Sequence, residues 1–317
     1  MEKVLITEKQ SFKYSLKKKI HASRFLILMI IPAIIYYVVF CYIPMYGILI
    51  SFTYYSPSLG IMGSVFNNWV GFDNFLRIFK QENFWKVIGN TVLIGGLKII
   101  ISFVSAIFVA LLINEIRMKF FKKVVQVIVT FPHFLSWVIV ASLFIMMLDD
   151  SGVFNHVITQ SGGEPIPFLY DRNMFLTVIF SSDVWKEAGW SSIIYIATMA
   201  GISPELYEAA DIDGATRLQK IWHITLPGIK ATAILLLIMS VGGVLSAGFD
   251  QIYNMTGMLN NPIITSVDVL DTYIYRYMSK VNFGVTSAIG LFKSVIGFIL
   301  VIVTDRIAKA CGERGII

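Results

Sequence analysis

The sequence contains few of the residues from which catalytic and metal sites are built. Its 317 residues include two cysteines, Cys41 and Cys311, and four scattered histidines. Neither residue type is spaced as in a disulfide framework or a zinc site. A glycine-rich loop ending in Gly-Lys-Ser or Gly-Lys-Thr, which would bind nucleotide phosphates, is also lacking. We therefore expect this chain itself to hold no catalytic residue, no metal and no cofactor.

Charged residues are also scarce, and this favours a membrane protein. Asp, Glu, Lys and Arg make up 15% of the sequence, whereas 56% is hydrophobic. A soluble domain cannot usually hide that much apolar surface, so we expect an integral membrane protein. The formal net charge of +6 fits a cytoplasmic excess of Lys and Arg better than binding to nucleic acid.

Long apolar stretches predict an all-α protein with six transmembrane helices, because a bilayer core needs about 20 mostly apolar residues per helix. The predicted spans are residues 25–50, 87–113, 124–148, 173–200, 229–250 and 282–304. The chain would then consist of a basic tail (1–24), a membrane domain (25–304) and a C-terminal tail (305–317). Pro32 and Pro44 lie inside the first span, where a kink is expected.

The distribution of basic residues predicts the orientation. Lys and Arg are concentrated in both tails, in the connection between the second and third spans, and in the connection between the fourth and fifth spans. Cytoplasmic loops carry such an excess, so both termini should be cytoplasmic. On the opposite side, residues 67–86 contain Phe72, Phe75, Leu76, Phe79 and Trp85. These fit either an amphipathic element on the outer membrane face or an interfacial aromatic belt.

The connection at about 201–228 is a polar island between two apolar stretches. Ser203 followed by Pro204 predicts a helix start, with a side-chain cap and proline in the first turn. The helix should end near Asp213, and Gly214 should permit a sharp turn. A second helix should follow, with an apolar face that packs back on the membrane bundle, until Pro227 ends it. The expected face contains Leu218, Ile221, Trp222 and Thr225.

The sequence of this island, EAADIDGATRLQKIWHITLP at 208–227, resembles the cytoplasmic loop by which permease subunits of ATP-driven (ABC) importers dock on their ATPase. The matching positions are Glu208, Ala209, Ala210, Asp213, Gly214, Ala215, Trp222, Ile224, Leu226 and Pro227. Trp222 departs from the family pattern, in which Phe is usual. Without the resemblance, an ordinary cytosolic helix-turn-helix would explain the loop. The resemblance implies that the stretch from Glu208 to Ala215 contacts the ATPase.

Other stretches resemble the oligosaccharide branch of the same family, although hydrophobic segments resemble one another easily. They are IPAIIYYVVFCYIPMYGILISF near the start and AIGLFKSVIGFILVIVTDRI near the end. The resemblance implies a type I importer permease fold with cytoplasmic coupling helices, in a bacterial inner membrane. It also implies a heterodimer with a second permease subunit, two ATPase subunits that bind ATP and Mg, an extracytoplasmic solute-binding protein and an oligosaccharide substrate.

Ionisable residues inside the predicted spans are candidates for function, because they are costly in lipid unless they are paired or face water. Asp183, Lys186 and Glu187 can pair along the fourth span, where they form either an ion-pair lock or part of a substrate path. Trp185 and Trp190 would supply aromatic surfaces to such a path. Lys98 and Lys293 lie in other spans. Lys98 is too central to reach the interface, so we expect a carboxylate partner.

The end of the fifth span, GFDQIYNMTG at 248–257, looks like the stretch that leads outward in sugar-importer permeases. It could touch passing substrate, or it could only cap the helix and anchor it at the interface. The candidate residues are Phe249, Asp250, Gln251, Tyr253 and Asn254. Two other functions stay open at this point, an ion-gradient-driven secondary transporter and an ABC permease for a solute other than sugar. The two halves of the sequence show no internal repeat, which disfavours the secondary transporter.

Overall fold

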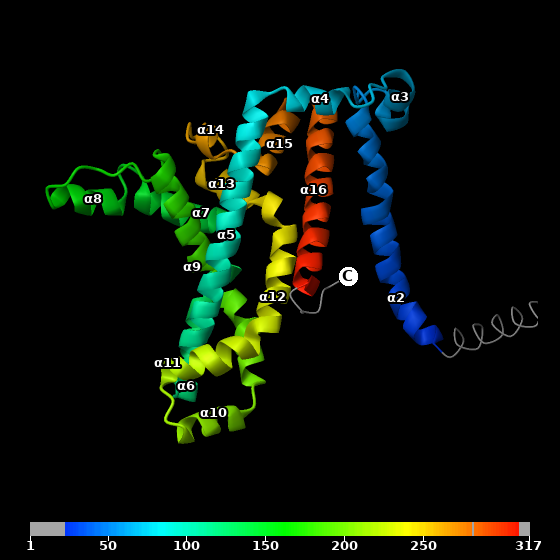
Figure 1. Ribbon diagram of the computed structural model, residues 1–317. Helices are drawn as coiled ribbons and strands as arrows, with labels where there is room; N and C mark the ends of the chain where they lie inside the picture. The colour runs from blue at the N-terminus through cyan, green and yellow to red at the C-terminus, as the bar shows by residue number, and fades with distance from the viewer. Residues whose placement is uncertain (1–22, 281, 311–317) are drawn as a thin grey trace, which may run out of the picture. The chain divides into compact units, whose positions relative to one another are not determined.

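A computed structural model describes residues 23–280 and 282–310, so most of both expected tails lies outside the described residues. The described chain is built from helices, with one isolated β-bridge between Thr53 and Trp69. It separates into two compact units, the first ending at Gly71 and the second beginning at Phe72 (Figure 1). The all-α prediction is confirmed for these residues.

The first unit is a long helical stretch followed by a short helix. Helix α2 (Arg24–Tyr37) continues through a π-helical turn, η1 (Val38–Tyr42), into a 3₁₀ helix, η2 (Ile43–Phe52), and α3 (Gly60–Asn67) follows. Pro32 lies inside α2, whereas Pro44 stands in the first turn of η2. The change of helix type therefore occurs just before Pro44.

The second unit contains the remaining helices. The first half of them comprises α4 (Asp73–Phe79), α5 (Glu82–Asn114), α6 (Lys119–Thr130), η3 (Phe131–Phe134), α7 (Trp137–Leu148), α8 (Val153–Gln160), α9 (Arg172–Ala200) and α10 (Pro204–Ile212). The second half comprises α11 (Arg217–Lys220), η4 (Ile221–Thr225), α12 (Leu226–Gly242), η5 (Val244–Ser246), α13 (Phe249–Met255), α14 (Ile264–Val267), α15 (Leu270–Ser279) and α16 (Phe283–Ala310).

The core of the second unit lies where the long helices run side by side. Helix α5 packs along α9, α12 packs along α16, and α6 packs on α9 (Figure 1). Two glycines allow close approach of backbones. A Cβ on Gly95 of α5 would lie 2.1 Å from the Val244 carbonyl oxygen, and one on Gly189 of α9 would lie 2.1 Å from that of Val129. These contacts fix α5 and α9 in the centre of the unit.

Five helical stretches of the described chain are long and apolar enough to cross a membrane. They are Arg24–Phe52, Glu82–Asn114, Trp137–Gln160, Arg217–Gly242 and Phe283–Ala310. Helix α9 has 29 residues and coincides with the predicted fourth span, but it carries Asp183, Lys186 and Glu187 and is not among the five.

Two predicted spans do not have the expected form. The third, 124–148, is interrupted between α6 and α7, because Pro132 lacks a backbone N–H and η3 tightens to a 3₁₀ turn around it. The fifth, 229–250, ends at Gly242. Ala247 and Gly248 then take left-handed backbone angles, with φ of 35° and 82°, and α13 leaves as a separate helix.

The aromatic and leucine residues of the segment 67–86 lie in two different environments. Phe72, Leu76 and Trp85 are exposed. Phe75 and Phe79 instead pack against an apolar cluster that includes residues of α5, α15 and α16. The aromatic residues therefore divide between surface and core, as expected when a short helix lies across the end of a bundle.

Candidate functional site

The loop at 201–228 folds as a short helix with a well-closed C-terminal end. Helix α10 begins with Pro204 in its first turn, as predicted. At its other end the Ala215 N–H donates to the Ala210 carbonyl at 2.9 Å, and the Gly214 N–H donates to that of Asp211 at 3.2 Å. This pair of bonds is a Schellman motif. It requires the left-handed conformation that Gly214 adopts, with φ of +74°.

Two details of the loop differ from the prediction. Ser203 makes no side-chain cap bond within the described structure. The cap of this region is instead the reciprocal pair Thr216 and Gln219 at the start of α11, a capping box that the sequence pattern T-x-x-Q could have indicated. Pro227 does not end the second helix. The π-helical turn η4 precedes it, and the chain continues without a break into α12.

The predicted apolar face of the second helix is also only partly buried. Thr225 is buried and Ile221 is half-buried, but Leu218 and Trp222 are 69% and 67% exposed. The prediction that this face packs on the bundle is therefore borne out for Ile221 and Thr225 and wrong for Leu218 and Trp222.

The tip of α10 projects as an exposed surface. Glu208, Ala209, Asp213 and Gly214 are exposed, and Ala210 and Ala215 are half-buried. Two contacts tie this surface to the membrane bundle. Lys220 of α11 pairs with Asp211 of α10, and the Tyr207 hydroxyl lies 3.0 Å from that of Thr225. A force on α10 would therefore reach α12 through α11 and η4.

A buried polar junction joins α5 to the middle of α9. Lys98 Nζ lies 2.8 Å from Asp183 Oδ1, and the Ser102 hydroxyl donates to Asp183 Oδ2 at 2.8 Å. Asp183 is 6% exposed, so each charge needs the other. The carboxylate partner expected for Lys98 is thus Asp183. Lys293 likewise pairs with Asp271 at 2.5 Å.

Gln251 extends this junction to the break between α12 and α13. Its Oε1 accepts a bond from Lys98 Nζ at 2.7 Å. Its Nε2 donates to the Ile179 carbonyl at 2.6 Å and to the Ser182 hydroxyl at 2.9 Å. The fully buried Gln251 side chain therefore connects α5, α9 and α13 at the left-handed residues 247–248.

A second polar cluster lies on α9 where α6 and α7 separate. Lys186 Nζ lies 3.0 Å from Glu187 Oε1 and donates to the His133 carbonyl at 2.7 Å. His133 Nδ1 lies 2.7 Å from Glu187 Oε2, and its ring stacks on Trp190 at 4.4 Å. The pairing predicted along α9 at a spacing of three or four residues is therefore wrong: Asp183 pairs with Lys98 of α5, and Lys186 pairs with the adjacent residue Glu187.

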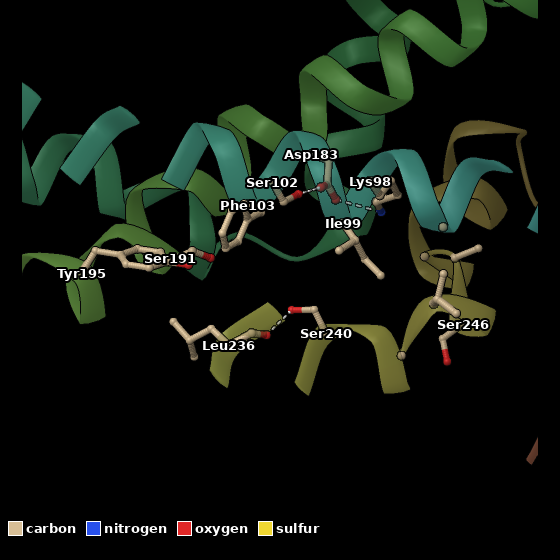
Figure 2. A pocket seen from close by; sticks show the side chains of 15 residues that line it. Lys98, Ile99, Ser102, Phe103, Asp183, Ser191, Tyr195, Leu236, Ser240 and Ser246 are labelled. Atoms are coloured by element: carbon tan, nitrogen blue, oxygen red, sulfur yellow. Dashed lines mark hydrogen bonds and ion pairs between the residues drawn. The ribbon is translucent and has the colours of Figure 1, made fainter. Parts of the chain in front are cut away.

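A cavity of about 280 Å³ lies between α5, α9 and the α12–η5 segment. Figure 2 shows Asp183 of α9 directed toward Ser102 and Lys98 of α5 at the cavity wall. The cavity is also lined by four residues that carry a hydroxyl group, Ser191, Tyr195, Ser240 and Ser246. These groups can exchange hydrogen bonds with a hydroxyl-rich solute, and the wall carries a neutralised charge pair.

The other residues predicted for the substrate path lie outside this cavity. Trp185 is half-exposed and meets Phe144 of α7 edge-on, at 6.1 Å between centroids. Phe249 and Tyr253 of α13 form an aromatic group with Tyr275 of α15, with centroids 5.1 to 5.7 Å apart.

The two remaining polar candidates lie beside this group on α13. Asp250 is exposed, and the side chain of Asn254 donates to its backbone carbonyl at 2.6 Å. Sequence reasoning missed Tyr275, Ser102 and Ser182, since nothing local distinguishes them from other helical residues.

Comparison with known proteins agrees with the loop resemblance. Residues 99–312 match the family described as "Binding-protein-dependent transport system inner membrane component". The chain is 42% identical to the polygalacturonan/rhamnogalacturonan transport system permease protein YteP of Bacillus subtilis (strain 168), over 98% of this chain and 96% of that protein. It is 40% identical to Protein LplB of the same organism, over 93% and 91%.

A solved structure shares the fold. It is a bacterial alginate ABC transporter in complex with an alginate pentasaccharide-bound periplasmic protein, and one of its chains superposes with a TM-score of 0.84. The two sequences are 36% identical, over 94% of this chain and 99% of that one. The family match covers well over half of the chain, and this chain is therefore a member of the family of inner membrane components of binding-protein-dependent transport systems.

Proposed function

We propose that this chain is one of two permease subunits of an ATP-driven importer of oligosaccharides. The observation that carries the proposal is the exposed tip of α10, which presents Glu208 and Ala209 on a short helix rigidly linked to the membrane bundle. Small side chains allow another protein to approach closely, and Glu208 offers a charged contact. Residues Glu208 to Ala215 would dock on an ATPase subunit that binds ATP and Mg.

In the proposed topology α9 also crosses the membrane, as the fourth of six spans, and both termini are cytoplasmic. A helix of 29 residues is about 43 Å long, more than the ~30 Å hydrocarbon core. Its charges are compatible with the membrane because Asp183 pairs with Lys98 and Glu187 pairs with Lys186. The basic residues of the connections orient the bundle with α10 in the cytosol.

In the proposed path a sugar passes the cavity wall at Asp183 and the aromatic group of α13. Hydroxyl hydrogen bonds and ring stacking each contribute on the order of 1 kcal/mol, enough to guide a sugar without trapping it. Phe249 and Tyr253 would stack on sugar faces, with Asp250 and Asn254 beside them. Trp185, Glu187 and Trp190 would complete the path at a subunit contact, and Gln251 would position Lys98.

The proposed partners are a second permease, two ATPase subunits and an extracytoplasmic binding protein that delivers the sugar. The alginate transporter was captured with its periplasmic protein and an oligosaccharide, which supports this assembly. The family assignment favours it over an ion-gradient-driven transporter. Fragments of acidic polysaccharides are the first substrates to test, because alginate is one.

The test combines co-purification with uptake. Affinity purification of the tagged chain from its host should recover an ATPase subunit, and membrane vesicles should take up an oligosaccharide only with ATP and the binding protein. A ligand screen of that binding protein, with neutral and uronate oligosaccharides, would name the substrate. Uptake driven by an ion gradient, with no ATPase recovered, would contradict the proposal.

A further inference from the structure

A narrow apolar groove of about 370 Å³ runs along the surface between α6 and α9. Its walls are formed by Val127 of α6, Phe131 and Phe134 of η3 and Ile193 of α9. Polar side chains are confined to Lys123, Gln126 and Thr130. The groove is therefore apolar along most of its length and has a cation at one end.

The chain segment that lines the groove is about as long as one leaflet of a bilayer is thick. From Lys123 to Phe134 the chain makes about two α-helical turns and one 3₁₀ turn, a rise of about 18 Å. Half of the hydrocarbon core measures about 15 Å. In the topology proposed above, Lys123 lies at the cytoplasmic surface, where the leaflet carries anionic lipids.

The three polar side chains of the groove, Lys123, Gln126 and Thr130, have no hydrogen-bond or ion-pair partner within the chain as described, and two of them matter here. Lys123 is exposed and takes part in no ion pair or hydrogen bond there, and Lys122 beside it bonds to Asn114. Thr130 is 9% exposed, and its Oγ1 is buried without a hydrogen-bond partner.

Thr130 is unusual among the helical threonines. The hydroxyls of Thr91, Thr198 and Thr304 each donate to the carbonyl four residues earlier, at 2.7 to 2.9 Å. This is the ordinary way in which a membrane helix satisfies such a group. The Thr130 hydroxyl does not make that bond, so it can donate a hydrogen bond to an acceptor on another molecule.

We propose that this groove binds an anionic phospholipid of the cytoplasmic leaflet, with the phosphate on Lys123, an ester oxygen within reach of Thr130 after rotation of its side chain, and an acyl chain between Val127, Phe134 and Ile193. A helix of the second permease would fill the groove less well. The backbone groups of a helix are bonded internally, so such a helix could pair Lys123 and Thr130 only through suitably placed polar side chains, whereas a phospholipid carries a phosphate and ester oxygens by its own chemistry. The inference rests on the proposed orientation but not on the substrate.

The experiment uses the full-length chain with its co-purified subunits, in nanodiscs of equal parts phosphatidylglycerol and phosphatidylcholine. Native mass spectrometry then counts the lipids retained. We expect phosphatidylglycerol to be retained over phosphatidylcholine, and Lys123→Gln to lower that retention several-fold. Val127→Trp should fill the groove and lower the retention of both lipids, and Thr130→Val should weaken retention at unchanged charge.

The controls separate a built site from diffuse attraction. Lys119→Gln removes the same charge from the same helix outside the groove and should have no effect, and Lys123→Arg should restore retention. Equal retention of the two lipids, or equal losses in Lys119→Gln and Lys123→Gln, would overturn the proposal. So would a cysteine at Phe134 that cross-links to the second permease and not to a photoactivatable lipid. The lipid counts involve no transport, so they can fail while the proposed transport function holds.

Discussion

Asp183 and Lys98 show how a single pair of side chains can decide whether a membrane helix is stable. Neither charge has enough contact with water to stand alone, and Ser102 and Gln251 complete their hydrogen bonds. Removing one member of a buried pair strands the other at a cost of about 3–5 kcal/mol, whereas replacing both with apolar residues is often neutral.

Asp183→Ala should therefore lower the thermal stability of the solubilised complex, and the double variant Lys98→Met with Asp183→Leu should recover most of it. Fluorescence-detected size exclusion after heating measures both. Asp250→Ala is the matched control, because that carboxylate is exposed and should leave stability unchanged. If the single and double variants lose equal stability, the pair is not the cause.

Gly214 is a residue whose role depends on backbone angle and not on space. An added Cβ would touch nothing within 4 Å, but φ is +74°, where other L-residues are strained by about 1–2 kcal/mol. Gly214→Val should distort the Schellman turn and uncouple ATP hydrolysis from uptake, more strongly when combined with Glu208→Lys.

Gly214→Asn supplies the control for this turn, because asparagine tolerates the left-handed conformation. ATPase activity and uptake are measured together in proteoliposomes. The ratio of uptake to ATP hydrolysis should stay near the wild-type value in Gly214→Asn and fall in Gly214→Val. Normal transport by the Glu208→Lys, Gly214→Val double variant in an intact complex would refute the docking role.

At the scale of helices, two prolines are accommodated in the same way. A five-residue π-helical turn ends two residues before Pro44 and another ends two residues before Pro227. Proline clashes with the carbonyl four residues earlier, and a wider turn relieves that clash. Both helices therefore continue past a residue that would otherwise stop them, and η4 keeps the α10 loop mechanically continuous with α12.

The contact between α5 and η5 can be tested with adjacent glycines. Gly95→Ala would place a Cβ against the Val244 backbone and should destabilise the chain by about 1–3 kcal/mol. Gly96→Ala meets nothing within 4 Å and should be neutral or stabilising, since alanine favours a helix. Heat-induced aggregation of the two variants measures the difference. Equal behaviour would show that the helices have room to separate.

Features set by local chemistry could be predicted from the sequence, and features set by distant contacts could not. The start at Pro204, the turn at Gly214 and the extent of α9 follow from residues within one or two turns. The partner of Lys98 lies on another helix, so spacing within α9 suggested the wrong pair.

The break after Gly242 was missed for a related reason. Left-handed angles such as those of Ala247 are unfavourable for alanine, so nothing local predicts them. The hydrogen bonds that Gln251 makes to α5 and α9 just beyond this break join residues far apart in the sequence. The exposure of Leu218 and Trp222 was unpredictable for a third reason, because periodicity finds an apolar face without showing whether the rest of the chain covers it.

At the scale of the whole molecule, the proposed orientation predicts which loops an impermeant reagent can reach. In a background lacking Cys41 and Cys311, a cysteine at Ser203 should resist a membrane-impermeant maleimide in intact cells, and one at Gly163 should react. Both positions are exposed, so burial does not confound the comparison. Labelling of the cysteine at position 203 from outside would contradict the proposed orientation, and the ATPase-docking role would then be wrong as well.

The pairing of Lys98 with Asp183 also constrains how the protein is made. Asp183 follows Ser102 by 81 residues, so at about 5–20 residues per second α5 reaches the membrane about 4–16 s before α9 emerges from the ribosome. Helix α9 is not apolar enough to insert readily into lipid by itself, and Lys98, which neutralises Asp183, is already in the membrane on α5. We therefore expect α5 to stay beside the insertion machinery during that interval, so that the order of the helices in the sequence contributes to the assembly of the membrane domain.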